Sequence, residues 1–286
     1  MRNLTAQVAG ETLGTYLLIL FGCGAVHAAV LTSAQSGLWQ VAIVWGVAIM
    51  VAVYVCGAIS GAHINPAISV ALALWGRFEW SRVPAYVGAQ VVGAFLAAAT
   101  LFFLYSPQLK LKEQELGVVR GQPESIVTAM CYGEYFPNPG PLRKPNLDDD
   151  KQMPIAEFLK QVPHTTAFLV EVLGTAVLAL VIFAVTDKRN AAAPPPGLAP
   201  VFIGLTVAAL ISIIAPLTQA CFNPARDLGP RLFAFLAGWG PAAIPGPNGI
   251  GFLTVYIIAP TLGAAIGGGL YEKLLRPMLP EPSPHE

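Results

Sequence analysis

The chain has 286 residues, of which 55% are hydrophobic and only 11% are charged, and its mean hydropathy is +0.62. This composition excludes an ordinary soluble domain and indicates an integral membrane protein. The formal net charge is +0 and the basic residues form no dense block, so nucleic acid is excluded as a partner.

Six long apolar segments predict six full transmembrane helices. Each is close to or above the roughly 20 residues that cross a hydrocarbon core of about 30 Å. The segments are 6–32, 39–59, 83–105, 164–186, 198–216 and 252–271. A signal peptide is the alternative for the first, but that segment is long, Glu11 interrupts it, and no clear cleavage site follows. It is therefore interpreted as a retained span.

Two shorter apolar segments each begin with the same tripeptide. The tripeptides are Asn65-Pro66-Ala67 and Asn223-Pro224-Ala225. Asparagine is a preferred helix cap and proline is tolerated in a first helical turn, so each tripeptide predicts a helix start. At about 1.5 Å per residue, segments 65–75 and 223–236 cross only about half of the hydrocarbon core. They are predicted to be re-entrant half-helices whose preceding loops face a water-filled path.

The two halves of the chain repeat one unit. The segment Glu11-Thr12-Leu13-Gly14-Thr15 matches Glu171-Val172-Leu173-Gly174-Thr175 at a shift of 160, and Asn65 matches Asn223 at a shift of 158. Three full spans per unit place the two copies in opposite orientations, which puts a transport path at the midplane. The predicted fold is therefore all-α transmembrane, with six spans and two half-helices in two inverted repeats. Its parts are a first repeat at 1–106, a long loop at 107–163, a second repeat at 164–276 and a flexible tail at 277–286.

Lysine and arginine in the short loops predict the orientation. One side collects Arg2, Arg77, Arg82, Lys188, Arg189, Lys273 and Arg276. The opposite short loops, near 33–38 and 237–251, contain neither residue type. Both termini are therefore expected in the cytoplasm and the 107–163 loop outside. The triplet Asp148-Asp149-Asp150 in that loop could bind a metal ion, but a solvated charged loop is the favoured interpretation.

Paired Asn-Pro-Ala boxes in an apolar chain resemble the aquaporin superfamily. Arg226 and Asp227, directly after the second box, are similar to the glycerol-facilitator branch. The resemblance covers most of residues 6–275 and departs mainly in 107–163. It implies a passive channel for glycerol and other small neutral solutes, with water, and with no cofactor or bound metal. It also implies a homotetramer with one pore per subunit, in the bilayer of the plasma (inner) membrane.

Two helix starts that face each other at mid-membrane repel cations, and the Asn65 and Asn223 amides can donate to a passing hydroxyl. The resemblance implies that the loops before them form a ladder of backbone acceptors. Its carbonyls are those of Gly61, Ala62, His63, Ile64, Gln219, Ala220 and Cys221. The His63 side chain could be a gate, but a hydrogen-bonded structural role is favoured.

Counting from the boxes, the resemblance places the selectivity filter on Trp45, Ile211, Ala220 and Arg226. Glycerol facilitators usually have a second aromatic residue at position 220 and a glycine at 211. The combination found here looks like one group of plant intrinsic proteins that pass glycerol. Trp45 and Ile211 are expected to meet the carbon edge of a polyol and Arg226 its hydroxyls.

Three acidic residues are expected to have structural roles. Arg226 could form a buried pair with Asp227, but adjacent helical residues point apart, so Arg226 is assigned to the pore and Asp227 to structure. Glu11 and Glu171 are carboxylates inside spans, where isolated charges are costly. The resemblance implies that they brace the re-entrant loops by accepting hydrogen bonds, rather than relaying protons.

Three other functions compete with a glycerol channel. An enzyme is disfavoured because no nucleophile and base pair, metal cluster or phosphate-binding loop appears, and Cys23, Cys56, Cys131 and Cys221 lack metal-ligand spacing. A gradient-coupled transporter would need titratable groups in the path, and only the two brace-like glutamates qualify. A channel that prefers water or neutral metalloid acids is the alternative left open, as are gating and the role of the long loop.

Overall fold

The computed structural model describes residues 3–35, 37–140 and 155–280. Six of its helical stretches are long and apolar enough to cross a membrane. The four continuous ones are α2 (Leu38–Ser60), α4 (Val83–Leu116), α7 (His164–Val185) and α8 (Ala199–Thr218). The first span is α1 (Leu4–His27) with a π-helical turn at Ala28–Thr32, and the last runs through α10 (Gly251–Leu253), a π-helical turn at Thr254–Ile258, and α11 (Ala259–Gly269). The all-α membrane fold predicted from the sequence is confirmed.

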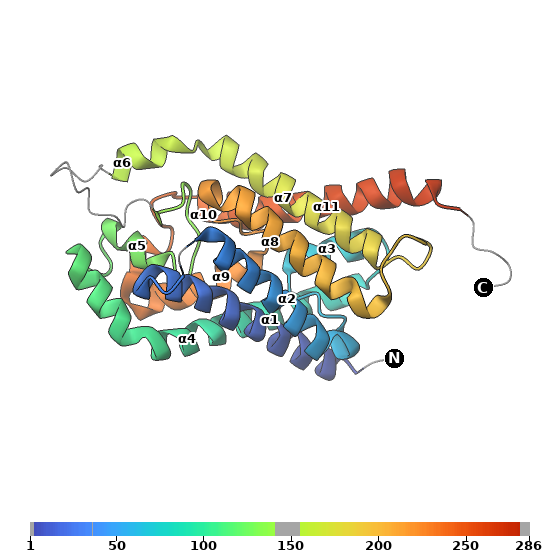
Figure 1. The fold of residues 1–286 in the computed structure, drawn as a ribbon, viewed down its shortest axis with the longest axis horizontal. Helices are drawn as coiled ribbons and strands as arrows, with labels where there is room; N and C mark the ends of the chain where they lie inside the picture. The colour runs from blue at the N-terminus through green and yellow to red at the C-terminus, as the bar shows by residue number, and fades with distance from the viewer. Residues whose placement is uncertain (1–2, 36, 141–154, 281–286) are drawn as a thin grey trace.

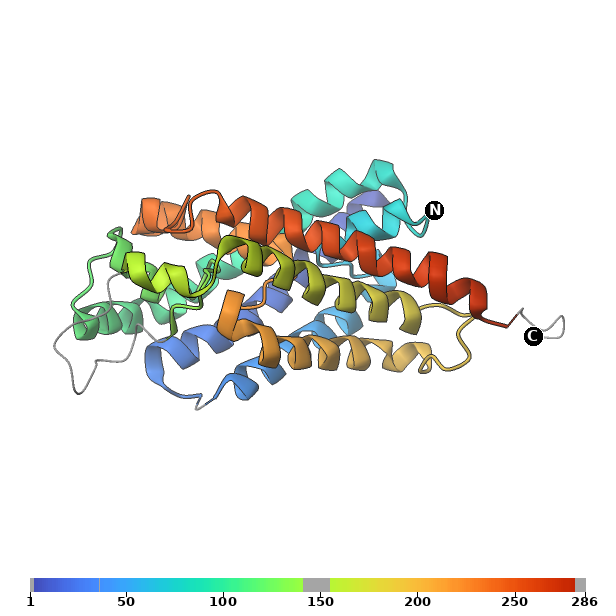
Figure 2. The same cartoon turned by 90° about the horizontal axis from the view of Figure 1, so that it is seen from above.

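Two short helices lie inside the bundle. α3 (Pro66–Leu74) and α9 (Pro224–Ala234) begin at the prolines of the two boxes. The long helices run roughly along one common direction around them (Figures 1 and 2). We call the end at which α1 begins and the last helix finishes the terminal end. The opposite end holds α5 (Ile126–Ala129) and α6 (Ile155–Phe158), and we call it the cap end.

Glycines at two related crossings let helices pack in backbone contact. α1 packs on α4, and α7 packs on α11. A Cβ on Gly93 would lie 2.2 Å from the carbonyl oxygen of Thr12, and a Cβ on Gly263 would lie 2.3 Å from that of Val172. Any side chain would force these helices apart, so the same device sets the spacing of the bundle in both halves.

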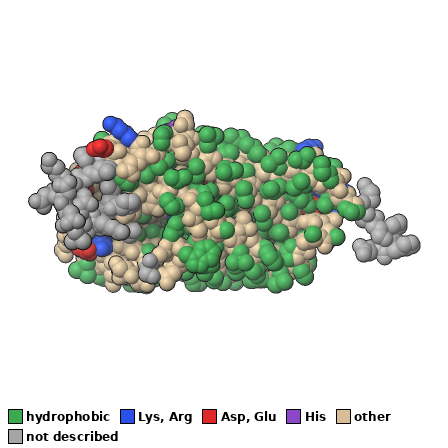
Figure 3. Space-filling view, turned by 45° about the horizontal axis from the view of Figure 1, so that its top comes forward, with side chains coloured by type: hydrophobic (Ala, Val, Ile, Leu, Met, Phe, Trp, Pro, Cys, Tyr) green, Lys and Arg blue, Asp and Glu red, His purple; other side chains and the backbone are tan. Residues whose placement is uncertain are grey.

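The outer surface of the bundle is apolar. Large hydrophobic side chains such as Phe103, Leu169 and Ile213 are more than 60% exposed. Hydrophobic side chains cover the middle of the face seen in Figure 3, and the charged ones visible there lie near its ends. Such a surface is stable against lipid and not against water, as expected for a membrane-spanning protein.

The region between the two repeats differs from the sequence prediction. α4 continues past the boundary expected at residue 106 and ends at Leu116, where Gly117 supplies a left-handed C-cap. Residues 125–137, placed by the sequence in a polar loop, are buried and pack on α9 and the segment after it. We call 125–138 the cap segment. The Asp148 to Asp150 triplet lies outside the described residues.

Candidate functional site

Asn65 and Asn223 cap the two half-helices. The Asn65 Oδ1 accepts from the backbone N–H of Ala67 (2.9 Å), and the Asn223 Oδ1 accepts from that of Ala225 (3.1 Å). These bonds satisfy donors that a helix start would leave unpaired. They also fix the orientation of each side-chain amide, so its Nδ2 points away from its own helix.

Each asparagine also reaches across to the other half of the chain. The Asn65 Nδ2 donates to the carbonyl of Phe222, and the Asn223 Nδ2 donates to the carbonyl of Ile64, both at 2.8 Å. An amide nitrogen carries two N–H groups. One is therefore used in this reciprocal pair of bonds, which joins the two half-helices end to end.

The loops before the asparagines are held in an unusual backbone conformation. Residues Gly61, Ala62 and Ile64 have positive φ, and so do Gln219, Ala220 and Phe222. Left-handed conformations in residues with a side chain cost free energy and persist where the surroundings compensate. Two buried glutamates supply hydrogen bonds that hold these loops.

Glu11 and Glu171 receive the loop amides. The Glu11 carboxylate accepts from the backbone N–H groups of His63 (2.9 Å) and Ile64 (2.7 Å). The Glu171 carboxylate accepts from those of Cys221 (3.0 Å) and Phe222 (2.9 Å). Both glutamates are fully buried. These bonds pair donors that would otherwise be buried without a partner.

His63 has a side-chain partner in α3, the half-helix that follows it. Its Nδ1 lies 3.1 Å from the Ser69 hydroxyl, and its ring packs against Phe78 and Tyr86. The residue also lines the cavity at the terminal end. Its ring is therefore held by Ser69, Phe78 and Tyr86, as expected for a structural role.

Arg226 is held by a residue of the cap segment. Its Nε lies 2.6 Å from the Glu134 Oε1, and its Nη1 donates to the carbonyl of Tyr132 at 2.9 Å. A second contact of Nη1 is the thiol of Cys23 at 3.5 Å. The guanidinium carbon lies 4.6 Å from the ring centre of Trp45. The guanidinium is thus fixed between an aromatic face and an acidic partner.

Asp227 has partners of its own. Its Oδ2 accepts from the Arg231 Nε and its Oδ1 from the Arg231 Nη2, each at 2.8 Å. The same Oδ1 accepts from the backbone N–H of Glu134 at 2.7 Å. Arg231 also donates to the carbonyls of Glu134 and Ala243. Asp227 therefore anchors the cap segment and does not pair with Arg226.

Three cavities follow one another through the bundle. The cap-end cavity has a volume of about 680 Å³ and the terminal-end cavity about 490 Å³. Between them lies a narrow cavity of about 50 Å³. Its lining includes all four residues predicted for the filter: Trp45, Ile211, Ala220 and Arg226. Asn65 and Asn223 line both the narrow and the terminal-end cavities.

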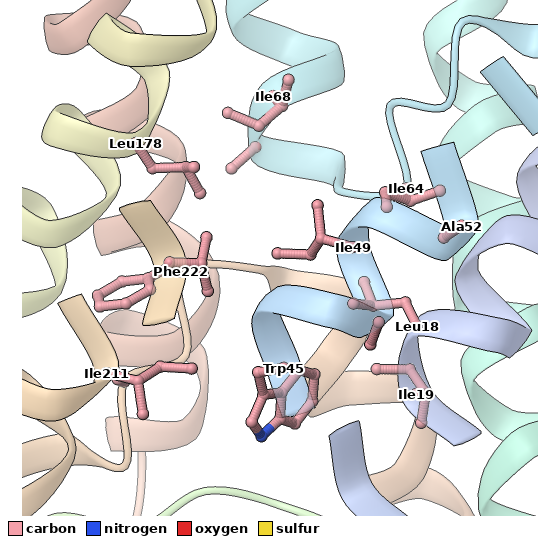
Figure 4. Close-up of a cluster of buried hydrophobic side chains, with 14 of the residues drawn as sticks. Leu18, Ile19, Trp45, Ile49, Ala52, Ile64, Ile68, Leu178, Ile211 and Phe222 are labelled. Carbon is pink, nitrogen blue, oxygen red and sulfur yellow. The ribbon is translucent and has the colours of Figure 1, made fainter. Parts of the chain in front are cut away.

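The predicted ladder residues are divided among these cavities. Gln219 lines the cap-end cavity, Ala220 and Cys221 line the narrow one, and residues 61–64 line the terminal-end one. Figure 4 shows Trp45 and Ile211 at one level of the buried cluster, with Ile49 and Leu178 farther along toward Ile68. One wall of the path is therefore apolar along its length.

Sequence reasoning missed Glu134 and the cap segment. The ion pair joins residues 134 and 226, and neither the repeat nor the helical periodicity relates them. The available signal is a single acidic residue within the aromatic stretch Tyr132–Phe136, which the long polar loop around it obscures.

The fold and the aligned cavities define a class of protein: a membrane channel built from two inverted halves. The chain belongs to the major intrinsic protein family, whose model matches residues 1–271. The predicted resemblance to this family is confirmed.

Similar proteins cover nearly the whole chain. It is 42% identical over 278 residues to the glycerol uptake facilitator protein of Pseudomonas aeruginosa, covering 97% of this chain and 91% of that relative. It is 39% identical over 278 residues to the propanediol uptake facilitator PduF of Citrobacter freundii, covering 97% and 95%. The X-ray structure of the aquaglyceroporin from Plasmodium falciparum matches with a TM-score of 0.77 and 25% identity, covering 96% of this chain and 98% of that one.

Proposed function

We propose that this protein is a passive channel for glycerol and other small neutral solutes, and that water uses the same path. The observation that carries the proposal is the narrow cavity between two wider ones, with Trp45 and Ile211 beside Arg226 in its lining. The names of the similar proteins support it, because glycerol and propanediol are both small, uncharged polyols.

A polyol matches this lining because it has two chemically different edges. Its carbon backbone can lie against Trp45 and Ile211, while its hydroxyls accept from the Arg226 guanidinium. Farther along, the second N–H of each box asparagine is available to the solute, because the first is bonded across the repeat. Hydroxyls thus exchange water for protein donors as they advance.

Cations are disfavoured by the two helix starts. α3 and α9 direct their amino ends toward the centre of the path, and each carries a partial positive charge of about half an elementary charge. The two ends are joined by the reciprocal asparagine bonds, so their fields add at one point. We infer that this barrier limits ion and proton leakage while neutral solutes pass.

Further assignments belong to the same proposal. Glu11, Glu171 and Asp227 serve as braces, and the carbonyls of residues 61–64 and 219–221 serve as acceptors. The terminal end is cytoplasmic, which is supported by the basic residues that gather there, and the membrane is the plasma (inner) membrane. The subunits assemble as a homotetramer.

Stopped-flow light scattering of proteoliposomes tests the function. We expect glycerol permeability at least tenfold above that of empty liposomes, with lower urea permeability and measurable water permeability. Equilibration should stop at equal concentrations, and a pH gradient should not drive accumulation. Glycerol flux equal to that of empty liposomes alongside rapid water flux would instead support a water-preferring channel, and uphill accumulation would support a transporter.

A further inference from the structure

A cluster of four charged side chains lies inside the cap end. Arg226, Glu134, Asp227 and Arg231 are each no more than 4% exposed. Two are positive and two are negative, so the cluster is neutral as a whole. Removing one member of a buried pair leaves an uncompensated charge, which is far more costly than the complete pair.

The charges are compensated in separate pairs. Arg226 contacts Glu134 (2.6 Å), whereas Asp227 binds Arg231 through both carboxylate oxygens. Within the described residues, the hydrogen-bond partners of the Arg226 guanidinium are the neutral Tyr132 carbonyl and Cys23 thiol, and the Trp45 ring that it faces is also neutral. Glu134 therefore supplies the negative charge that balances Arg226.

Glu134 acts from behind the path. Arg226 lines both the cap-end and the narrow cavity, whereas Glu134 lines neither. Among the described residues, the contact recorded for the Glu134 carboxylate is the ion pair with Arg226, and neither of its oxygens accepts a hydrogen bond from another residue. Its backbone is fixed on both sides, since its N–H binds Asp227 and its carbonyl binds Arg231.

We propose that Glu134 is a positioning residue of the filter, which holds the Arg226 guanidinium against the wall and cancels its charge toward the path. This inference rests on the proposed channel function. Because the guanidinium is held in place, the narrow cavity stays open to glycerol. Because the Glu134 carboxylate balances the guanidinium charge, an anion in the path finds no net positive charge to bind. Glu134 thus favours neutral solutes although it does not line the path itself.

The variant Glu134→Gln tests both consequences, with Glu124→Gln as the matched control because Glu124 is exposed in the same region. An untethered Arg226 should obstruct glycerol more than water, so we expect the ratio of glycerol to water permeability to fall at least fivefold.

Nitrate is the anion probe for the second consequence, and its concentration is equal on both sides of the membrane. The nitrate concentration is about 100 mM, which exceeds the dissociation constant of a weak, millimolar site. Relative to gluconate at equal ionic strength, we expect nitrate to slow glycerol and water flux at least threefold in Glu134→Gln. It should not slow either flux in the wild-type protein or in Glu124→Gln.

Two further variants separate positioning from mere structural support. Glu134→Asp keeps the charge and should restore nitrate resistance even if flux is reduced. In an Arg226→Gln background, Glu134→Gln should no longer create nitrate block, because no excess positive charge remains. If Glu134→Gln does not fold, this double variant and Glu134→Asp still test the proposal.

Loss of all fluxes without nitrate block, or nitrate block that persists in the Arg226→Gln background, would overturn the inference. An unchanged glycerol-to-water ratio with no nitrate effect would do the same. Failure of the proposed function is distinguishable, because the wild-type protein would then not pass glycerol. Nitrate block could still be read from water flux.

Discussion

The two ends of the pore carry corresponding residues with different chemistry. The shift of 158 that relates the boxes also relates Gly46 to Gly204, which contact each other where α2 crosses α8. Applied to the residues predicted for the filter, which are Trp45, Ile211, Ala220 and Arg226, it gives Ile203, Val53, Ala62 and Ile68. All four of these counterparts line the terminal-end cavity. The repeat therefore places a second ring of residues opposite the filter, and that ring is entirely apolar.

The centre of the pore, by contrast, is nearly the same in both halves. Glu11 and Glu171 receive equivalent loop amides. The Tyr86 hydroxyl donates to the carbonyl of Ser60 (2.6 Å), and the Tyr256 hydroxyl donates to that of Thr218 (3.2 Å), the matching position. The hydrogen bonds that support the asparagines are thus duplicated, while the filter that we propose lies at the end of the pore where the two halves differ.

The largest effect is expected from removing one of the two buried glutamates that support the loops in both halves. Glu171→Ala leaves two buried loop N–H groups and the Thr218 hydroxyl without their acceptor, at about 1 to 3 kcal/mol each. We expect a severe loss of folded protein in detergent, measured by size-exclusion chromatography. Glu11→Ala should do the same and Glu157→Ala, at an exposed site, should not. A well-folded Glu171→Ala protein with altered pH dependence of flux would favour a proton relay instead.

Replacing a residue of the proposed filter by its counterpart in the terminal-end cavity should have the next largest effect. Trp45→Ile introduces the residue found at position 203 and removes the ring beside Arg226, a contact worth about 0.5 to 2 kcal/mol. We expect discrimination between glycerol and larger polyols to fall about tenfold in liposome flux assays. Trp39→Ile, at a site that is 56% exposed, is the control and should change nothing. Unchanged discrimination would show that Trp45 does not select solutes.

A pair of identical substitutions sharpens the contrast between the two rings. Ala220 and Ala62 both have positive φ, but one lines the 50 Å³ cavity and the other the 490 Å³ cavity. Ala220→Phe should therefore reduce the flux of solutes larger than glycerol severalfold more than water flux. Ala62→Phe should carry a similar backbone cost and leave the selectivity nearly unchanged. Equal effects of the two variants on every flux would contradict the assignment of Ala220 to the filter.

The smallest effect is expected at the rim of the terminal end, where the charges lie outside the path. Asp187 follows α7 and accepts from Tyr271 and Arg276. Burial raises the pKa of its carboxyl, but hydrogen bonds from the Arg189 backbone, Tyr271 and Arg276 outweigh this, so the pKa lies below its usual 3.8.

Because that pKa is lowered by folding, the stabilisation is present above about pH 4 and is lost as the pH falls through the folded value. Asp187→Asn should lower the melting temperature at pH 7 by roughly 2 °C, since partly exposed pairs contribute below about 1 kcal/mol. The difference should vanish near pH 3, and glycerol flux should not change. A change in solute selectivity would show that the rim charges do reach the path.

The sequence predicted the repeated centre of the pore better than the cap end. The spans, the half-helices and the braces depend on local hydrophobicity and on a repeat, so Glu11, Glu171 and the asparagines could be singled out. The cap segment could not, because its burial depends on contacts such as Trp239 with Thr128 and Tyr135 with Ala242, far apart in the chain. Glu134, the partner of Arg226, was missed for the same reason. The sequence prediction placed the end of α4 too early because the last turns of this helix are polar.

The reciprocal bonds between the asparagines and the opposite loops have a consequence for biosynthesis. Glu11 belongs to the same half as residues 63 and 64, so the amides of the first loop can be paired soon after that half is made. The Ile64 carbonyl and the Asn65 Nδ2, however, obtain their partners only from residues 222 and 223. A ribosome must therefore add some 160 further residues, on the order of ten seconds of translation, before the first half can complete its pore wall. During that interval the Asn65 Nδ2 and the Ile64 carbonyl lack the partners that they have in the finished channel.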